Sequence, residues 1–276
     1  MTTRLWVGGV AVGVLLMWLA VLALPDGLLH VAFLDVGQGD AILVTIPDGR
    51  QMLIDGGPTA TDLNWRLGQE MPFWDHSLNL VVNTHPDADH LAGLAPLLDC
   101  YQVDQALVTD VGSDSNLYRE WKTQLAETDL TPTIGQVGMQ LALGSGVTAT
   151  LLTPGPATAR EDQTNNHSVV MYLQMGRISF LLTGDIEKPV AHDLVFEHAP
   201  LRTTVLKSPH HGSKTSSSNM FMEAVNPQIV VISVGVDNQF DHPSPEVLDR
   251  YAEHGLIVFR TDEQGTIEFS TDGEQS

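Results

Sequence analysis

The sequence predicts an α/β fold in which β-sheets pack face to face and helices cover the outside. From Leu28 onward, short apolar runs bounded by Gly, Pro and Asp dominate the chain, as they do in strands. Segments with apolar residues at three- and four-residue spacing interrupt these runs, as in helices that lie on a sheet. Strands followed by helices occur twice, so each group can form one sheet with helices on its outer face.

The predicted strands are short runs rich in β-branched and other apolar residues between turn formers. They are His30–Leu34, Ala41–Ile46, Gln51–Ile54, Leu78–Val82, Gln105–Thr109, Val147–Leu152, Val169–Leu173 and Ile178–Leu182. Two further strand-like runs come later, one ending at Lys207 and one covering Ile229–Val234.

Helices are predicted where apolar residues recur on one face of a helical repeat. These segments are Asn116–Thr128, Glu187–Glu197, Ser217–Val225 and Pro245–His254. Ser244 before the last one is a typical N-cap, and Pro245 suits the first turn. No internal repeat or long linker is visible, so we interpret residues 28–276 as one catalytic domain.

The N-terminal residues 1–27 are predicted to form a membrane anchor. Leu5–Leu24 has no charged residue, and a helix of this length reaches roughly 30 Å, the thickness of the hydrocarbon core of a bilayer. An uncleaved anchor is favoured over a signal peptide, whose apolar stretch is usually about 7 to 15 residues. Arg4 precedes the segment and the next basic residue is Arg50, so we expect a single-pass protein with an extracytoplasmic catalytic domain.

The composition is strongly acidic, with 34 Asp and Glu against 13 Lys and Arg and a formal net charge of −21. This charge repels nucleic acid and anionic membrane surfaces at long range. A polyanionic substrate therefore requires a local positive charge, which bound divalent cations would supply. Cys100 is the one cysteine, so an intrachain disulfide is excluded.

The segment Thr84–His90 carries the most chemistry. His85, Asp87, Asp89 and His90 lie within six residues, directly after an apolar strand-like run. Imidazole and carboxylate groups at this spacing can serve two neighbouring metal ions, each with a position left open. The sequence therefore predicts a metal-dependent hydrolase with a dinuclear site.

Later segments deliver further candidates at the ends of strands. Asp185 follows a buried strand in Gly-Asp, and is predicted to bridge two metals. Lys207, the pair His210 and His211, and His242 also follow strand-like runs. All are expected to gather at one edge of the sheets. Two nearby features have simpler interpretations: the Gly-rich segment Asp35–Asp40 is predicted to form a tight turn, and Asp55 to hydrogen-bond the turn that carries the first motif.

These motifs resemble those of the metallo-β-lactamase superfamily, whose first motif is usually His-x-His-x-Asp-His. More narrowly, they are similar to the metallo-β-lactamase-like domain of ComEC-type competence DNA-uptake proteins. The similarity covers residues from about 28 to 270, with the motifs in order. They are Phe33–Asp40, Leu53–Gly57, His85–Leu94, Leu206–Ser216, Ser233–Gly235, His242–Pro243 and Arg260–Ile267.

The resemblance implies an αββα sandwich and a dinuclear site for phosphodiester cleavage, with a role in degrading one strand of incoming DNA. By position, His85 and Asp87 would bind one metal, Asp89 and His90 the other, and His242 would complete a shell. The chain offers one apolar span where the family has a bundle of channel helices. A channel would therefore be a separately encoded partner.

Several roles stay open at this point. The resemblance leaves His210 and His211 each as a metal ligand or as a proton donor to the leaving oxygen, and His167 as a ligand or a surface-loop histidine. Asp89 is expected to orient the attacking water. Ser213, Lys214 and Thr215, together with Lys207, are predicted to hold a neighbouring phosphate.

The two metals are expected to be zinc or manganese. Asp87 stands where the superfamily usually has a histidine, and a hard oxygen ligand shifts the metal preference towards manganese. The histidines of the site are also suitable ligands for zinc. The leading hypothesis is a membrane-anchored phosphodiesterase acting on DNA. One alternative is a hydrolase of small phosphodiesters or phosphocholine esters, which the acidic surface favours. Another is a non-catalytic module that docks on a DNA channel.

Overall fold

The computed structural model describes residue 13 and residues 24–128, 130–153 and 164–274. The expected anchor Leu5–Leu24 lies outside this part of the chain, apart from residues 13 and 24. Among the residues that are described, none of the helices has both the length and the apolar character needed to cross a bilayer.

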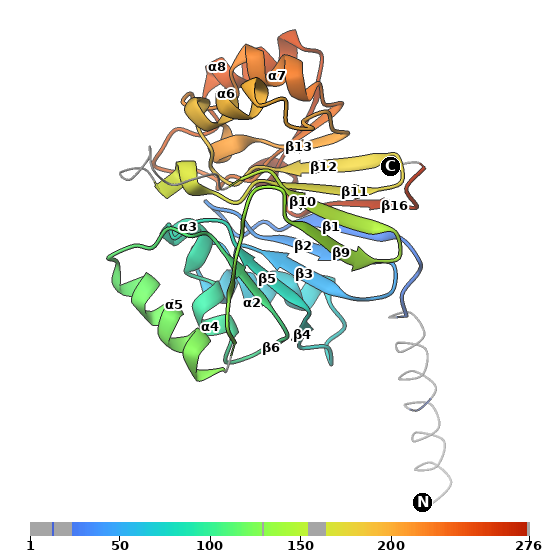
Figure 1. Cartoon of the computed structure of the whole chain (residues 1–276), viewed down its shortest axis with the longest axis vertical. Coiled ribbons are helices and arrows are strands. Elements are labelled where there is room, and N and C mark those ends of the chain that lie inside the picture. Colours follow the sequence, from blue (N-terminus) through green and yellow to red (C-terminus); the bar gives the residue numbers. More distant parts are fainter. Residues whose placement is uncertain (1–12, 14–23, 129, 154–163, 275–276) are drawn as a thin grey trace, which may run out of the picture.

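Two seven-stranded sheets lie face to face between outer helices (Figure 1). The first sheet has the order β16(Ile267–Thr271), β1(Leu29–Phe33), β2(Ile42–Thr45), β3(Gln51–Ile54), β5(Leu80–Asn83), β7(Ala106–Val108), β8(Thr133–Ile134). The second has the order β15(Ile257–Arg260), β14(Ile229–Ile232), β13(Val205–Lys207), β12(Ile178–Leu182), β11(Met171–Met175), β10(Val147–Leu151), β9(Gln140–Gly144). Short strands β4(Ser77–Leu78) and β6(Gln102–Val103) pair separately.

Helices cover each sheet on its outer face, as the sequence predicts. The first sheet is covered by α2(Ala60–Glu70), α3(Ala88–Leu91), α4(Leu94–Leu97) and α5(Asn116–Glu127). The second is covered by α6(Lys188–Phe196), α7(Asn219–Val225) and α8(Pro245–Glu253). A short helix α9(Thr261–Gln264) follows β15, and 3₁₀ turns η2(Thr164–His167) and η3(Pro209–Gly212) lie in loops.

The alternation of side chains along the strands builds three apolar layers. In β12, Ile178, Phe180 and Leu182 belong to the core between the two sheets, whereas Leu181 belongs to the core beneath α6 to α8. The two-residue period of a strand sends successive side chains to opposite faces, so a strand covered on both sides is apolar throughout. The αββα expectation is confirmed.

Some elements were not predicted from the sequence. The run Leu78–Val82 was expected to be one strand, but it divides at Asn79 into β4 and β5, which pair in different sheets. Asn79 explains the break, because its side chain accepts a hydrogen bond from the Gln51 amide and donates to Asp104. Helix α2, which also lacked a prediction, begins at a Thr59 N-cap that accepts from the Asp62 amide.

Parallel pairing places the functional loops at one edge. Strand β3 runs parallel to β5, and β12, β13 and β14 run parallel to one another. Their carboxyl ends therefore meet at the same side of the molecule, and the loops that follow them converge there.

Candidate metal centre

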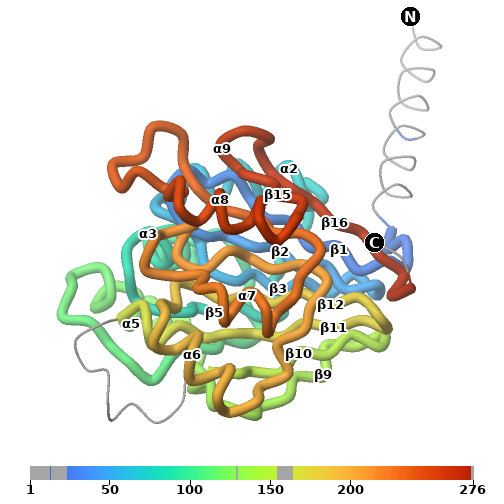
Figure 2. The backbone as a smooth tube through the Cα atoms, turned by 90° about the horizontal axis from the view of Figure 1, so that it is seen from above, coloured from blue at the N-terminus to red at the C-terminus, as the bar shows by residue number. Residues whose placement is uncertain are grey.

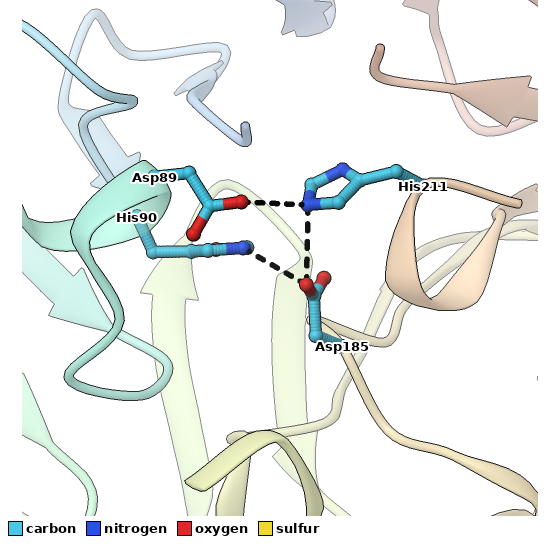
Figure 3. A group of neighbouring side chains, drawn as sticks. All are labelled: Asp89, His90, Asp185 and His211. Atoms are coloured by element: carbon cyan, nitrogen blue, oxygen red, sulfur yellow. Dashed lines mark ion pairs between the residues drawn. The ribbon is translucent and has the colours of Figure 1, made fainter. Parts of the chain in front are cut away.

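Four side chains from distant parts of the chain converge at this edge. Asp89, His90, Asp185 and His211 each offer an atom within 4.8 Å of the others (Figure 3). Asp185 Oδ2 lies 3.2 Å from His90 Nε2 and 3.1 Å from His211 Nε2, and Asp89 Oδ2 lies 3.4 Å from His211 Nε2. The sequence placed all four at one edge, and the structure brings them together.

Local backbone geometry directs each ligand. Helix α3 begins directly after the loop that follows β5, so Asp89 and His90 lie in its single turn. Asp185 follows Gly184, which has a φ of +50°, a backbone conformation that favours glycine. A side chain at this position is also excluded by space, because its Cβ would lie 2.8 Å from Ser168 Cβ. His210 and His211 both have positive φ, at 48° and 52°. Two consecutive non-glycine residues in this region are strained, a feature that clusters at functional sites.

Each histidine of the centre is held through its Nδ1 atom. His90 Nδ1 lies 2.8 Å from Asp55 Oδ2, and His211 Nδ1 lies 2.9 Å from the Ser233 carbonyl oxygen, which can only accept. His85 Nδ1 lies 3.0 Å from Thr84 Oγ1. These partners fix the tautomer with the proton on Nδ1 and the lone pair on Nε2, as in metal sites where a second group orients the ligand.

Within the part of the chain that the structure describes, the Nε2 atoms themselves have no hydrogen-bond partner. His85, His90 and His211 each bury Nε2 without a hydrogen bond of acceptable geometry, although a carboxylate oxygen lies within ion-pair distance of each of them. A buried, unsatisfied polar atom is costly, so the Nε2 atoms of these neighbouring rings call for a partner such as a bound cation. The donor set of imidazole nitrogens and carboxylate oxygens fits a divalent metal.

Asp55 forms the predicted hydrogen bonds to the turn and also contacts a ligand histidine. Its Oδ1 accepts from the Thr84 amide at 2.8 Å, and its Oδ2 accepts from the Thr84 hydroxyl at 2.6 Å and from His90 Nδ1. The prediction that Asp55 hydrogen-bonds the turn carrying the first motif is confirmed. Asp55 directly follows β3, so its carboxylate ties the orientation of the His90 ring on α3 to the end of that strand.

A buried ion pair lies directly behind the centre. Lys207 is fully buried, and its Nζ lies 2.5 Å from Asp40 Oδ2, 3.3 Å from Asp185 Oδ1 and 3.0 Å from the Gly184 carbonyl oxygen. The two oxygens of Asp185 are thereby divided: Oδ1 faces the ammonium, and Oδ2 faces the histidines. The expectation that Lys207 reaches a substrate phosphate is wrong for this arrangement, because the ammonium is enclosed by carboxylates.

The electrostatic environment favours protons on two histidines when no metal is present. Burial tends to lower the pKa of His211, but the carboxylates of Asp185, Asp40 and Asp89 outweigh it and raise that pKa to about 9. Burial likewise opposes protonation of His90, yet Asp185 and Asp55 raise its pKa well above the usual value. Burial and the neighbouring His90 lower the pKa of His85 to about 3. A metal ion would therefore compete with protons at His90 and His211.

A second metal position is suggested beside the first. His85 and His90 have ring centroids 4.1 Å apart, and His85 Nε2 lies 3.8 Å from Asp87 Oδ2. Thr164 donates a hydrogen bond of 2.7 Å to Asp87 Oδ1, which directs the other oxygen towards His85. His85 and Asp87 with Asp185 between the two positions would form the second half of a dinuclear centre.

The other predicted histidines lie around this centre. His210 is adjacent, with its Nδ1 3.5 Å from Glu187 Oε1 and 3.4 Å from Thr215 Oγ1. His242 lies beyond it, at a ring centroid distance of 5.7 Å, with a buried Nδ1 that lacks a hydrogen bond. His167 is buried in η2, and among the described residues it belongs neither to the cluster above nor to a second group of possible ligands, which consists of Asp40, Asp55 and His90. The ligand roles of His242 and His167 stay predictions.

The predicted phosphate-binding residues follow η3. Ser213 Oγ lies 3.0 Å from Thr215 Oγ1, so these two hydroxyls form a pair that extends to His210. Lys214 is exposed, and its carbonyl oxygen accepts from Lys188 Nζ at 2.8 Å. The hydroxyl pair therefore borders the centre on the side of His210.

Two residues of the site were not singled out as functional. Asp40 lies in the loop after β1, and Gly39 allows its approach, since a Cβ at Gly39 would lie 2.0 Å from the Asp89 carbonyl oxygen. Ser168 accepts from the Asp185 amide at 3.0 Å and lies 3.3 Å from His85 Nδ1. The Gly-x-Gly-Asp pattern was the available signal for Asp40, whereas Ser168 left no comparable signal.

The family assignment follows from comparison with known proteins. The model of the metallo-beta-lactamase superfamily matches residues 34–236, so the chain belongs to this superfamily. ComE operon protein 3 of Bacillus subtilis is 32% identical over 258 residues, which covers 87% of this chain and 33% of that protein. Competence protein ComA of Neisseria gonorrhoeae is 29% identical over 90% of this chain and 33% of its own length. The resemblance to ComEC-like proteins is confirmed, and this chain spans about a third of these relatives.

Solved structures support the fold. Igni18, a metallo hydrolase from Ignicoccus hospitalis, has a TM-score of 0.58 at 15% identity, covering 88% of this chain and 98% of that one. YhfI, a metallo-beta-lactamase fold protein from Bacillus subtilis, has a TM-score of 0.56 at 14% identity, covering 87% and 99%. At this identity the similarity shows the fold alone.

Proposed function

We propose that this protein is a membrane-anchored, metal-dependent phosphodiesterase that cleaves DNA outside the cytoplasm during competence-type uptake. The proposal has three parts: metal-dependent hydrolysis, DNA as substrate, and attachment to the membrane. Each part is supported by different observations.

The hydrolase part is carried by the three buried Nε2 atoms. His85, His90 and His211 have their Nδ1 atoms hydrogen-bonded, while their buried Nε2 atoms lie near carboxylates, that of His85 near Asp87 and those of His90 and His211 near Asp185. Divalent ions at this point would supply Lewis-acid stabilisation of the charge that develops on a phosphoryl group. The ligand set extends to two positions, which favours hydrolysis over a structural role, since structural zinc needs four closed ligands.

The chain's own residues prepare the site for this chemistry. Asp55 and the Ser233 carbonyl hold the ligand rings in the required tautomer. Lys207 keeps Oδ1 of Asp185 occupied, so that Oδ2 alone is directed at the ligand cluster. His210 borders the centre with a lowered pKa, caused mainly by burial, so it is neutral at pH 7 and can hold or exchange a proton there.

The DNA part is supported by the relatives. Two of them are named for competence or its operon, and the chain matches about a third of their length. The proposal includes a separately encoded channel protein as the partner through which the DNA would pass. The membrane part is supported by the uncharged segment Leu5–Leu24 and by Arg4 before it.

The test combines metal content with cleavage. The purified protein should contain zinc or manganese, and with either metal it should cleave DNA and bis(p-nitrophenyl) phosphate. Asp185→Asn should lose bound metal and cleavage together, by at least the roughly 10- to 100-fold typical when a residue that supports a ligand is changed. Asp99→Asn is the matched control, because Asp99 is an exposed carboxylate outside the ligand clusters.

The outcomes separate the competing functions. The net charge of −21 favours the alternative of a small phosphodiester or phosphocholine ester as substrate, because such a ligand is repelled less than DNA. Turnover of the ester without cleavage of DNA would establish that alternative. Absence of turnover for both substrates with both metals would leave the non-catalytic module that docks on a DNA channel.

A further inference from the structure

An exposed aromatic residue lies in the loop between β14 and α8. Phe240 is 52% exposed and lies among polar residues, including Asp237 and Asn238. The loop projects from the body of the molecule near α8 (Figure 2). Exposed apolar side chains are common on protein surfaces, and Trp65 and Phe196 are more exposed than Phe240, so the position of Phe240 relative to the metal centre decides whether it can bind a ligand.

The loop is built to hold this ring in place. Asn238 Oδ1 accepts from the Phe240 amide at 3.2 Å and from the His242 amide at 3.0 Å, and Asn238 Nδ2 donates to the His242 carbonyl oxygen at 2.6 Å. The Phe240 ring stacks on the His242 ring, with centroids 5.9 Å apart and planes at 27°. One face of Phe240 is therefore supported and the remaining surface is available.

A row of rings connects Phe240 to the metal centre. His242 lies 5.7 Å from His210, and His210 lies 6.1 Å from His211, measured between ring centroids. His211 belongs to the ligand cluster. Phe240 is thus three ring-to-ring steps from a ligand, a distance that a few nucleotides of single strand can span.

The charge of the protein limits what its general surface can contribute to DNA binding. With a formal net charge of −21, attraction of the phosphate backbone to the general surface is unfavourable. Stacking of bases on aromatic rings contributes affinity without positive charge, and it accepts every base because each has a π-face. Bases paired within a duplex do not offer their faces in this way.

We propose that Phe240, supported by His242, is a stacking site for an unpaired base of the DNA strand whose phosphodiester reaches the metal centre. The inference rests on the proposed function for its substrate. It adds that the substrate is single-stranded where it meets this loop, and that recognition does not depend on base sequence.

The test measures DNA binding by the full-length protein in detergent, with EDTA present to prevent cleavage. The probes are a fluorescent oligothymidine of about 20 nucleotides, an abasic strand of the same length, and a duplex of that length. The wild type should bind oligothymidine more tightly than the other two. Phe240→Ala should weaken oligothymidine binding about tenfold and bring it to the abasic value, whereas Phe240→Trp should retain tight binding.

Phe196→Ala is the matched control, since Phe196 is 71% exposed at the end of α6, and it should bind like the wild type. Equal affinity of the wild type for oligothymidine and the abasic strand would overturn the inference, as would wild-type binding by Phe240→Ala or a lack of any DNA binding. Turnover of bis(p-nitrophenyl) phosphate by the metal-loaded wild type is measured separately. Its absence would count against the hydrolase, whereas normal ester turnover together with wild-type DNA binding by Phe240→Ala would count against the stacking site alone.

Discussion

Replacement of Lys207 tests the role of the buried ammonium behind the metal centre. Lys207→Met keeps the length and apolar stem of the side chain and removes its charge. Asp40 is 1% and Asp185 2% exposed, so both carboxylates would lose a buried cation that contacts them at 2.5 and 3.3 Å. Breaking a buried ion pair by removing one partner costs about 3–5 kcal/mol, so the free energy of unfolding should fall by about this amount.

A double-mutant cycle assigns the loss to the ion pair. Asp40→Asn alone leaves Lys207 paired with Asp185. In the double variant, Asp40→Asn removes one of the two carboxylate charges that Lys207→Met leaves without a cation. The double variant should therefore be more stable than the sum of the single losses predicts, by about 1–3 kcal/mol. The assay is urea unfolding of the metal-free protein at pH 7, followed by the intrinsic fluorescence of its tryptophans.

Stabilisation by added metal ions provides a second test on the same variants. Without the ammonium, Oδ1 of Asp185 has lost its partner, and the site carries one more uncompensated negative charge. Divalent ions should then restore more stability to Lys207→Met than they add to the wild type. Strictly additive losses in the cycle, or a variant as stable as the wild type without metal, would refute this account of Lys207.

Two further predictions concern pH. The pKa of His211 is raised to about 9, so in the metal-free protein its stabilising contribution is complete below the ordinary value near 6.5 and is lost as the pH rises through 9. Because metal must displace this proton, the apparent metal affinity should increase from pH 6.5 to 9, with proton release. A calorimetric titration that gives the same metal affinity at every pH would contradict this prediction. At His30, burial lowers the pKa, but hydrogen bonds and charges from Asp26 and Glu268 outweigh it and raise it. This stabilisation is present below pH 6.5 and fades as the pH rises through the raised pKa, so His30→Gln should lower the melting temperature more at pH 6 than at pH 9, and an equal decrease at both would argue against the ion pairs.

The sequence predicted the parts of the centre that depend on short spacing and on strand ends. His85 to His90 directly follow β5 of the first sheet, and Asp185 follows β12 of the second in Gly-Asp, so both groups lie at strand ends that the face-to-face packing of the sheets brings together. The sequence did not separate His210 from His211, since both follow the same strand. Their backbone separates them: η3 turns His211 towards Asp185 and leaves His210 facing Glu187 and Thr215.

The contacts behind the centre were harder to predict because they depend on packing between the two sheets. Lys207 sits at the end of a strand, where a lysine beside two histidines resembles a substrate-binding group. Its burial against Asp40 depends on how closely the loop after β1, in the first sheet, approaches β13 in the second. No spacing within either segment encodes that distance.

The balance of charge at the centre explains why cations are expected there. Asp40, Asp55, Asp89 and Asp185 bring four carboxylates to the same region, and Lys207 supplies one permanent positive charge against them. In the absence of metal, protons on His90 and His211 reduce the excess, which is the origin of their raised pKa values. Divalent ions would neutralise the carboxylates more completely and would satisfy the Nε2 atoms at the same time. Divalent ions at this centre would therefore create a favourable local charge for an anionic substrate, while the Asp40–Lys207 pair keeps Asp185 oriented beneath it.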